Sequence, residues 1–107
     1  MKNGKIESSY ESNHHQTPIR PNQFQALIID VRDNWEHQTL KKLPNSLNIP
    51  FLELISKPEK YISNKNQLVI TYCNYGNRSG QATQILRQKG YKVLVLERGV
   101  ENYFLGK

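Results

Sequence analysis

Four short, largely apolar runs are the feature that most constrains the fold of this chain. They lie at residues 27–31, 47–49, 68–72 and 92–97, and segments with helical spacing separate them. Runs of this length, rich in Val, Ile and Leu, are typical of parallel strands that are buried on both faces. The sequence therefore predicts an α/β fold, a single domain whose mostly parallel central sheet is flanked by helices on both faces.

Helical segments are expected between these runs. The most regular one covers residues 79–89, and Gly90 follows it where a helix-ending glycine is favoured. Because strands alternate with helices along the chain, the order of elements also supports a parallel sheet. Shorter helical segments are predicted at residues 33–37, with Asp33 as N-cap, at residues 51–55 and at residues 59–62.

The first part of the chain differs in composition from the rest. Asn, Ser, Gln, His and Pro dominate residues 1–23, where large apolar side chains are nearly absent. Such a segment cannot bury enough surface to offset the entropy cost of ordering it. We expect a polar, flexible arm over residues 1–23 and one domain over residues 24–107, since 107 residues are too few for two ordinary domains.

Composition excludes several classes of function. No apolar run approaches the length of a membrane helix, and the first residues are too polar for a secretion signal. A single cysteine excludes an internal disulfide and a multi-cysteine zinc site. The net charge is +6, but the basic residues are scattered, so nucleic acid is not the favoured partner. We expect a cytoplasmic protein with no membrane contact, no metal and no organic cofactor.

The most informative segment follows the third apolar run, where the residues read Tyr-Cys-Asn-Tyr-Gly-Asn-Arg-Ser-Gly from position 72. Cys73 is placed just beyond the carboxyl end of a predicted strand, where ligand sites of parallel sheets lie. Gly76 can adopt a positive φ that turns backbone N–H groups inward, and Ser79 can cap the following helix. The helix N-terminus and Arg78 favour the thiolate, which can attack an electrophilic sulfur, phosphorus or arsenic centre.

Other interpretations of these residues remain open from the sequence. A lone cysteine at a strand end is often a small buried apolar residue, although the glycine, arginine and serine that follow Cys73 favour a functional thiol. Arg78 is as well explained by a structural salt bridge as by substrate binding. Asp30 and Arg32, at the end of the first run, are expected to support the site. They could form an ion pair that fixes the strand to the following turn, orient Arg78, or line the mouth of the pocket.

Several segments occur in an order and spacing that resemble a known family. They are residues 27–33 (Leu-Ile-Ile-Asp-Val-Arg-Asp), 35–37 (Trp-Glu-His), 47–50 (Leu-Asn-Ile-Pro), the loop Cys73-x-x-Gly76-x-Arg78-Ser79, the helical segment 82–91 that ends in Lys-Gly-Tyr, and 93–99 with its final glycine. Together, over about residues 24–103, they resemble the single-domain rhodaneses of the sulfurtransferase family. The resemblance implies a persulfide formed on Cys73 in a ping-pong cycle. It also implies substrate binding by the loop residues Asn74, Tyr75, Gly76, Asn77, Arg78 and Ser79.

Loop length distinguishes the chemistries within that family. The loop from Cys73 to Arg78 has six residues, which resembles the sulfurtransferases, whereas related phosphatases and arsenate reductases have one residue more. The implied donor is thiosulfate, another small sulfur-containing anion or a persulfide, and the implied acceptor is cyanide, a thiol or a protein. The alternatives are a persulfide carrier or interaction module without turnover and, less favoured, a cysteine phosphatase or arsenate reductase.

One departure from the family pattern bears on the donor. Members that use thiosulfate efficiently often carry extra basic residues in the loop, but Asn74, Tyr75 and Asn77 are neutral here. We therefore expect poor capture of thiosulfate and a preference for another persulfide donor.

Overall fold

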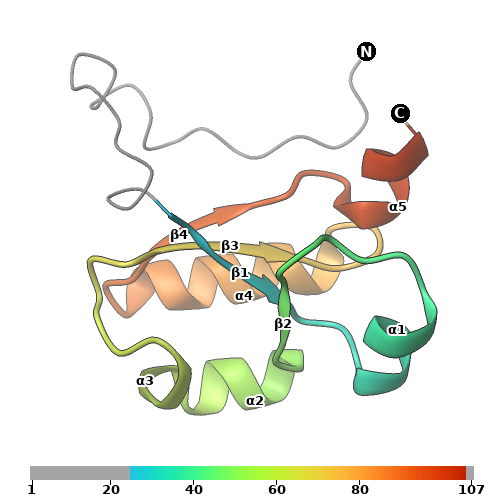
Figure 1. Cartoon of the computed structure of the whole chain (residues 1–107). Coiled ribbons are helices and arrows are strands. Elements are labelled where there is room, and N and C mark those ends of the chain that lie inside the picture. The colour runs from blue at the N-terminus through green and yellow to red at the C-terminus, as the bar shows by residue number, and fades with distance from the viewer. Residues whose placement is uncertain (1–24, 106–107) are drawn as a thin grey trace.

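A computed structural model describes residues 25–105, so the arm predicted over residues 1–23 lies outside the described residues. Strands and helices alternate along this part of the chain, which confirms the predicted α/β fold (Figure 1). The elements are β1 (Leu27–Asp30), α1 (Asn34–Thr39), β2 (Leu47–Asn48), α2 (Phe51–Ser56), α3 (Pro58–Tyr61), β3 (Leu68–Tyr72), α4 (Asn77–Gln88), β4 (Lys92–Val95) and α5 (Gly99–Leu105).

The four strands form one parallel sheet in the order β2-β1-β3-β4. Asp30, at the end of β1, is in register with Tyr72, at the end of β3. Since all strands run in the same direction, their carboxyl ends meet at one edge of the sheet. This register places the residues that follow β1 beside Cys73, which follows β3.

Helices cover both faces of the sheet, as the sequence predicts. On one face α2, α3 and α4 enclose the larger apolar core, in which strand residues such as Ile29 and Val69 pack against Leu54 and Leu86 (Figure 1). On the other face, side chains of α5 pack on Tyr72 in a smaller core. In the part of the chain that the structure describes, no helix is long and apolar enough to cross a membrane.

Helix boundaries agree with most of the sequence predictions but differ at the start of α4. Asp33 is the N-cap of α1, and Gly90 follows the end of α4 with φ 97°, both as predicted. However, α4 begins at Asn77, and its N-cap is Gly76 in the left-handed conformation with φ 102°. The prediction that Ser79 caps this helix was therefore wrong. An N-cap at Gly76 draws the first helical N–H groups three residues nearer to Cys73.

Candidate active site

Cys73 lies at the junction between β3 and α4 and is only 2% exposed. Its sulfur accepts hydrogen bonds from two backbone N–H groups, that of Gly76 at 3.1 Å and that of Ser79 at 3.4 Å. The hydroxyl of Ser79 is 3.3 Å from the sulfur. Two backbone donors and one hydroxyl from the start of a 12-residue helix thus surround one sulfur atom, an arrangement suited to negative charge.

The strand and helix on either side of this junction are tied together beneath the sulfur. The hydroxyl of Thr71 lies 2.8 Å from that of Thr83 in α4 and donates to the carbonyl of Ser79 at 3.3 Å. All three residues are buried. The first turn of α4 is therefore fixed to β3 from below, which keeps the N–H of Ser79 aimed at Cys73.

The start of α5 holds the loop from the other side. Val100 N–H donates to the carbonyl of Cys73 at 2.8 Å, and Glu101 N–H donates to that of Asn74 at 3.1 Å. Both loop carbonyls are thus directed to α5. The close approach requires Gly99, which has φ 79° and where an added Cβ would lie 2.2 Å from the carbonyl oxygen of Asn74.

Arg78 is positioned by a carboxylate that comes from α1. Its Nη1 and Nη2 donate to Oε1 and Oε2 of Glu36 at 3.0 and 3.3 Å. Glu36 also accepts the backbone N–H of Asp33 at 3.0 Å, so the start of α1 fixes the carboxylate. Burial alone would lower the pKa of Arg78, but the hydrogen bonds and charge of Glu36, with smaller contributions from the charges of Cys73 and Asp33, outweigh it and raise this pKa.

Asp30 and Arg32 form a fully buried ion pair next to the loop. Arg32 donates from Nε and Nη2 to the Asp30 carboxylate at 2.8–3.0 Å, and from Nη1 to the side-chain oxygen of Asn74 at 2.7 Å. Its Nη2 also donates to the carbonyl of Lys41 at 3.0 Å. The pair therefore braces the loop through Asn74, while Arg78 is oriented by Glu36.

Hydrogen bonds to the buried carboxyl of Asp30 outweigh the effect of burial on its pKa. Burial alone would raise the pKa of this carboxyl, but hydrogen bonds from Arg32 and from His37 outweigh it and hold the pKa below its ordinary value of 3.8. His37 Nδ1 lies 2.8 Å from Oδ2 of Asp30, so the imidazole is a hydrogen-bonding neighbour of the pair.

The predicted loop residues come together around the sulfur, but their side chains differ in availability. The backbone N–H groups of Gly76 and Ser79 contact the sulfur directly, whereas the side-chain oxygen of Asn74 is committed to Arg32. Tyr75 is 65% exposed and Asn77 is also exposed, so both side chains face outward.

Comparison with known proteins agrees with this architecture. The sequence matches the family described as rhodanese-like domain over residues 13–105. The chain belongs to the rhodanese-like domain family. The domain is 38% identical over 63 residues to thiosulfate sulfurtransferase PspE of Escherichia coli, a match that covers 59% of this chain and 60% of that protein. It is 32% identical over 103 residues to the rhodanese domain-containing protein CG4456 of Drosophila melanogaster, covering 81% of this chain and 88% of that one.

A solved structure supports the same assignment of this rhodanese-like domain. A rhodanese with anions from E. coli superposes with a TM-score of 0.63 at 33% identity, covering 73% of this chain and 91% of that one. The family resemblance drawn from the sequence is thus confirmed.

Two residues that shape the site of this rhodanese-like domain were not recognised as site residues from the sequence. Glu36 is spaced three residues after the N-cap Asp33, which marks a helix start but does not reveal a contact with Arg78, 42 residues later. Gly99 is the first residue of α5, and only the three-dimensional contact shows that it packs against the backbone of Asn74.

Proposed function

We propose that this rhodanese-like domain is a sulfurtransferase in which Cys73 is the nucleophile. The observation that carries the proposal is the set of donors on its sulfur, the N–H groups of Gly76 and Ser79 at 3.1 and 3.4 Å. These donors stabilise negative charge both on the resting thiolate and on a persulfide sulfur held in the same place. The relation to thiosulfate sulfurtransferase PspE supports this class of reaction.

The cycle has two displacement steps and needs no external oxidant. The Cys73 thiolate attacks the sulfane sulfur of the donor, an S–S bond forms, and the bond to the remainder of the donor breaks. The bonding electron pair departs with that remainder, as sulfite from thiosulfate or as a thiolate from a hydropersulfide. A thiophilic acceptor such as cyanide or a thiolate then attacks the sulfane sulfur, and the electron pair of the breaking S–S bond returns to Cys73.

Loop size favours sulfur transfer over phosphate or arsenate chemistry. The six residues from Cys73 to Arg78 place the N–H of Gly76 and that of Ser79 within 3.4 Å of the same sulfur. Added oxygens of a tetrahedral oxyanion would need donors further from the sulfur. A single sulfane sulfur needs little more room than the thiolate itself.

Intact mass spectrometry tests the proposal. The full chain is mixed with thiosulfate or with 2-hydroxyethyl hydropersulfide, its mass is measured, and cyanide is then added. We expect a gain of one sulfur atom that cyanide removes, together with thiocyanate formation. The Cys73→Ala variant, whose small side chain suits the buried position, is the matched control and should gain no sulfur.

The same experiment separates the alternatives. A persulfide that forms on Cys73 but resists cyanide and small thiols would replace turnover with a carrier role. Absence of any adduct with both donors would refute sulfur transfer. Hydrolysis of an aryl phosphate by the wild-type chain but not by Cys73→Ala would favour a phosphatase instead.

A further inference from the structure

The charge around Arg78 bears on the choice of donor. Arg78 is the only charged residue between Cys73 and Ser79, and its side chain is 36% exposed. Glu36 takes up two of its N–H donors in a bidentate pair at 3.0 and 3.3 Å. A guanidinium has five such donors, so at most three remain for a ligand. Arg78 can still form hydrogen bonds to a donor, but its positive charge is already balanced by the carboxylate of Glu36.

Other acidic groups lie around the same guanidinium. Asp33 is joined to Glu36 through its backbone N–H, and its carboxyl is on the exposed N-cap residue of α1. The charge of the Cys73 thiolate also acts on Arg78. Arg32, which contacts the loop through Asn74, is already balanced by Asp30. A small donor that approaches Arg78 therefore meets a guanidinium whose charge is offset by the carboxylates of Glu36 and Asp33.

We propose that Glu36 determines donor selectivity, an inference that rests on the sulfur transfer proposed above. Because its carboxylate cancels the charge of Arg78, the site disfavours dianions such as thiosulfate. It favours donors that carry a single negative charge, namely the hydropersulfides of thiols. Glu36 is a positioning residue in this scheme, since it acts on the donor through Arg78.

An electrostatic effect of Glu36 on the donor can be distinguished from a structural one by comparing donors of different charge. Removal of one negative charge near the bound donor changes the interaction energy of a dianion by twice the amount for a monoanion. For a unit charge behind Arg78 in a water-like dielectric, we expect roughly a fivefold gain with thiosulfate and about a twofold gain with a monoanionic donor. A loosened loop would instead slow both donors by similar factors.

The experiment measures the second-order rate constant for sulfur loading of Cys73 by mass spectrometry of quenched samples. The donors are thiosulfate and 2-hydroxyethyl hydropersulfide, and the variant is Glu36→Gln. Glutamine keeps an oxygen that can accept the N–H of Asp33, and Gln is accepted at this position of a capping box, so α1 should still form.

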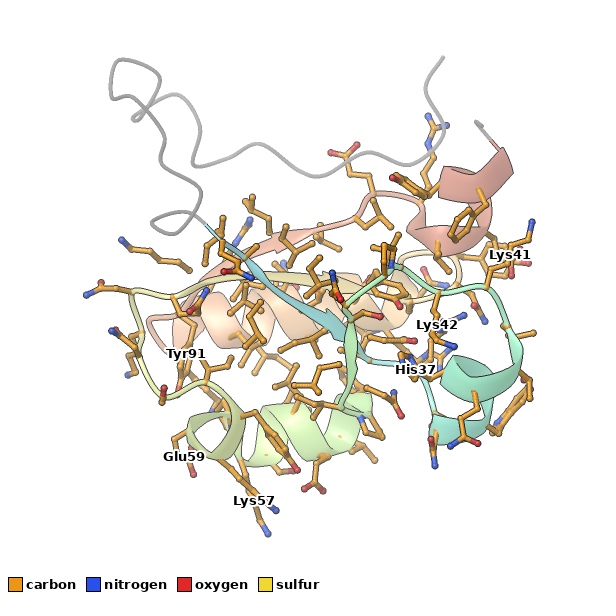
Figure 2. The ribbon with its side chains drawn as sticks, viewed as in Figure 1. His37, Lys41, Lys42, Lys57, Glu59 and Tyr91 are labelled. Atoms are coloured by element: carbon orange, nitrogen blue, oxygen red, sulfur yellow. The ribbon has the colours of Figure 1, made fainter. Side chains whose placement is uncertain are left out.

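Two further variants provide controls. Glu36→Asp keeps the negative charge but shortens the side chain, so we expect no gain with thiosulfate. Glu59→Gln changes the net charge by the same amount at the opposite end of the molecule from His37, which shares α1 with Glu36 (Figure 2). We expect Glu59→Gln to load both donors at the wild-type rate. If Glu36→Gln does not fold, Asp33→Asn replaces it, with a smaller gain in the same direction, because Asn is also a good N-cap.

Each outcome is decisive. The proposal is supported if the loading rate rises more with thiosulfate than with the hydropersulfide, and if this rise is seen only in variants that lose the negative charge. Equal changes for both donors, or a loss with thiosulfate in Glu36→Gln, overturn it and leave Glu36 with a structural role only. If no variant and no donor loads Cys73, sulfur transfer itself fails, and that result is distinct from the other two.

Discussion

Replacement of Gly99 by alanine should displace the active-site loop. An added Cβ would lie 2.2 Å from the carbonyl oxygen of Asn74 and 2.5 Å from the backbone nitrogen of Tyr75. Both neighbours are backbone atoms, so a side-chain rotation cannot relieve the contact. To restore a separation of 3.0 Å, the loop or the turn must move by about 0.8 Å.

The magnitude follows from the bonds that this movement weakens. Val100 and Glu101 donate to the loop carbonyls at 2.8 and 3.1 Å, and each such bond contributes about 1 kcal/mol. The positive φ of 79° at Gly99 adds about 1–2 kcal/mol of strain for a residue with a Cβ. We expect a loss of about 2–4 kcal/mol in the free energy of unfolding, and about a hundredfold slower loading of Cys73, because a misplacement near 1 Å costs that much.

Two other glycines provide matched controls in the same chain. Gly80, in α4, has open space where a Cβ would stand, so Gly80→Ala should stabilise the helix by about 0.5–1 kcal/mol. Gly90 also has a positive φ, 97°, but a Cβ there would meet only the flexible side chain of Lys65 at 3.6 Å. Gly90→Ala should therefore lose about 1–2 kcal/mol without slowing Cys73.

Urea unfolding and the rate of sulfur loading on Cys73 are measured for all three alanine variants. Together they separate the effect of backbone strain at the glycine from the effect of displacing the active-site loop. If Gly99→Ala loads sulfur as fast as Gly90→Ala, the loop is not held by the turn before α5, and the reasoning is refuted.

Three further predictions concern the buried polar groups. Arg32→Met removes the guanidinium that balances the buried carboxylate of Asp30, leaving the hydrogen bond with His37, and should cost about 3–5 kcal/mol in urea unfolding. A loss below about 1 kcal/mol would contradict the role of the pair. Because the pKa of Asp30 is below 3.8 in the folded state, the contribution of its carboxylate to stability is complete above that value and is lost as the pH falls further. Asp30→Asn lacks this carboxylate, so its free energy of unfolding should drop less steeply below about pH 4 than that of the wild type. Tyr72→Phe removes the hydroxyl that accepts the N–H of Leu43 at 3.1 Å and lies 2.8 Å from Ser46 Oγ, which should cost about 1–3 kcal/mol in the free energy of unfolding. Cys73 should still be alkylated at the wild-type rate, and a changed rate would argue against a purely structural role of the hydroxyl.

The layered fold and the place of the thiol could be predicted because both follow from local patterns. The runs at 68–72 and 92–97 are apolar over lengths that suit buried strands; β3 occupies the first run, and β4 occupies residues 92–95 of the second. Cys73 follows one of them, and the carboxyl edge of a parallel sheet then fixes where it lies.

The polar contacts of the site could not be predicted in the same way, because they join residues that are far apart in the chain. Arg32 and Asn74 are separated by 42 positions, as are Glu36 and Arg78. The register of β1 with β3 brings both pairs together, and no periodicity in the sequence reports it. The start of α4 was misplaced for a related reason. Serine is a common N-cap, but Gly76 already supplies the left-handed turn, and the helix begins there.

Besides the tie between β3 and α4, the loop around Cys73 is braced by three segments that are distant in the chain: the residues after β1 through Arg32, α1 through Glu36, and α5 through Val100. None of these is its neighbour in the chain, so a peptide containing the loop alone would lack every brace. We therefore expect the native reactivity of the thiol to require the chain from β1 to α5 to come together. The rate at which Cys73 reacts during refolding would report when these distant segments have assembled around the loop.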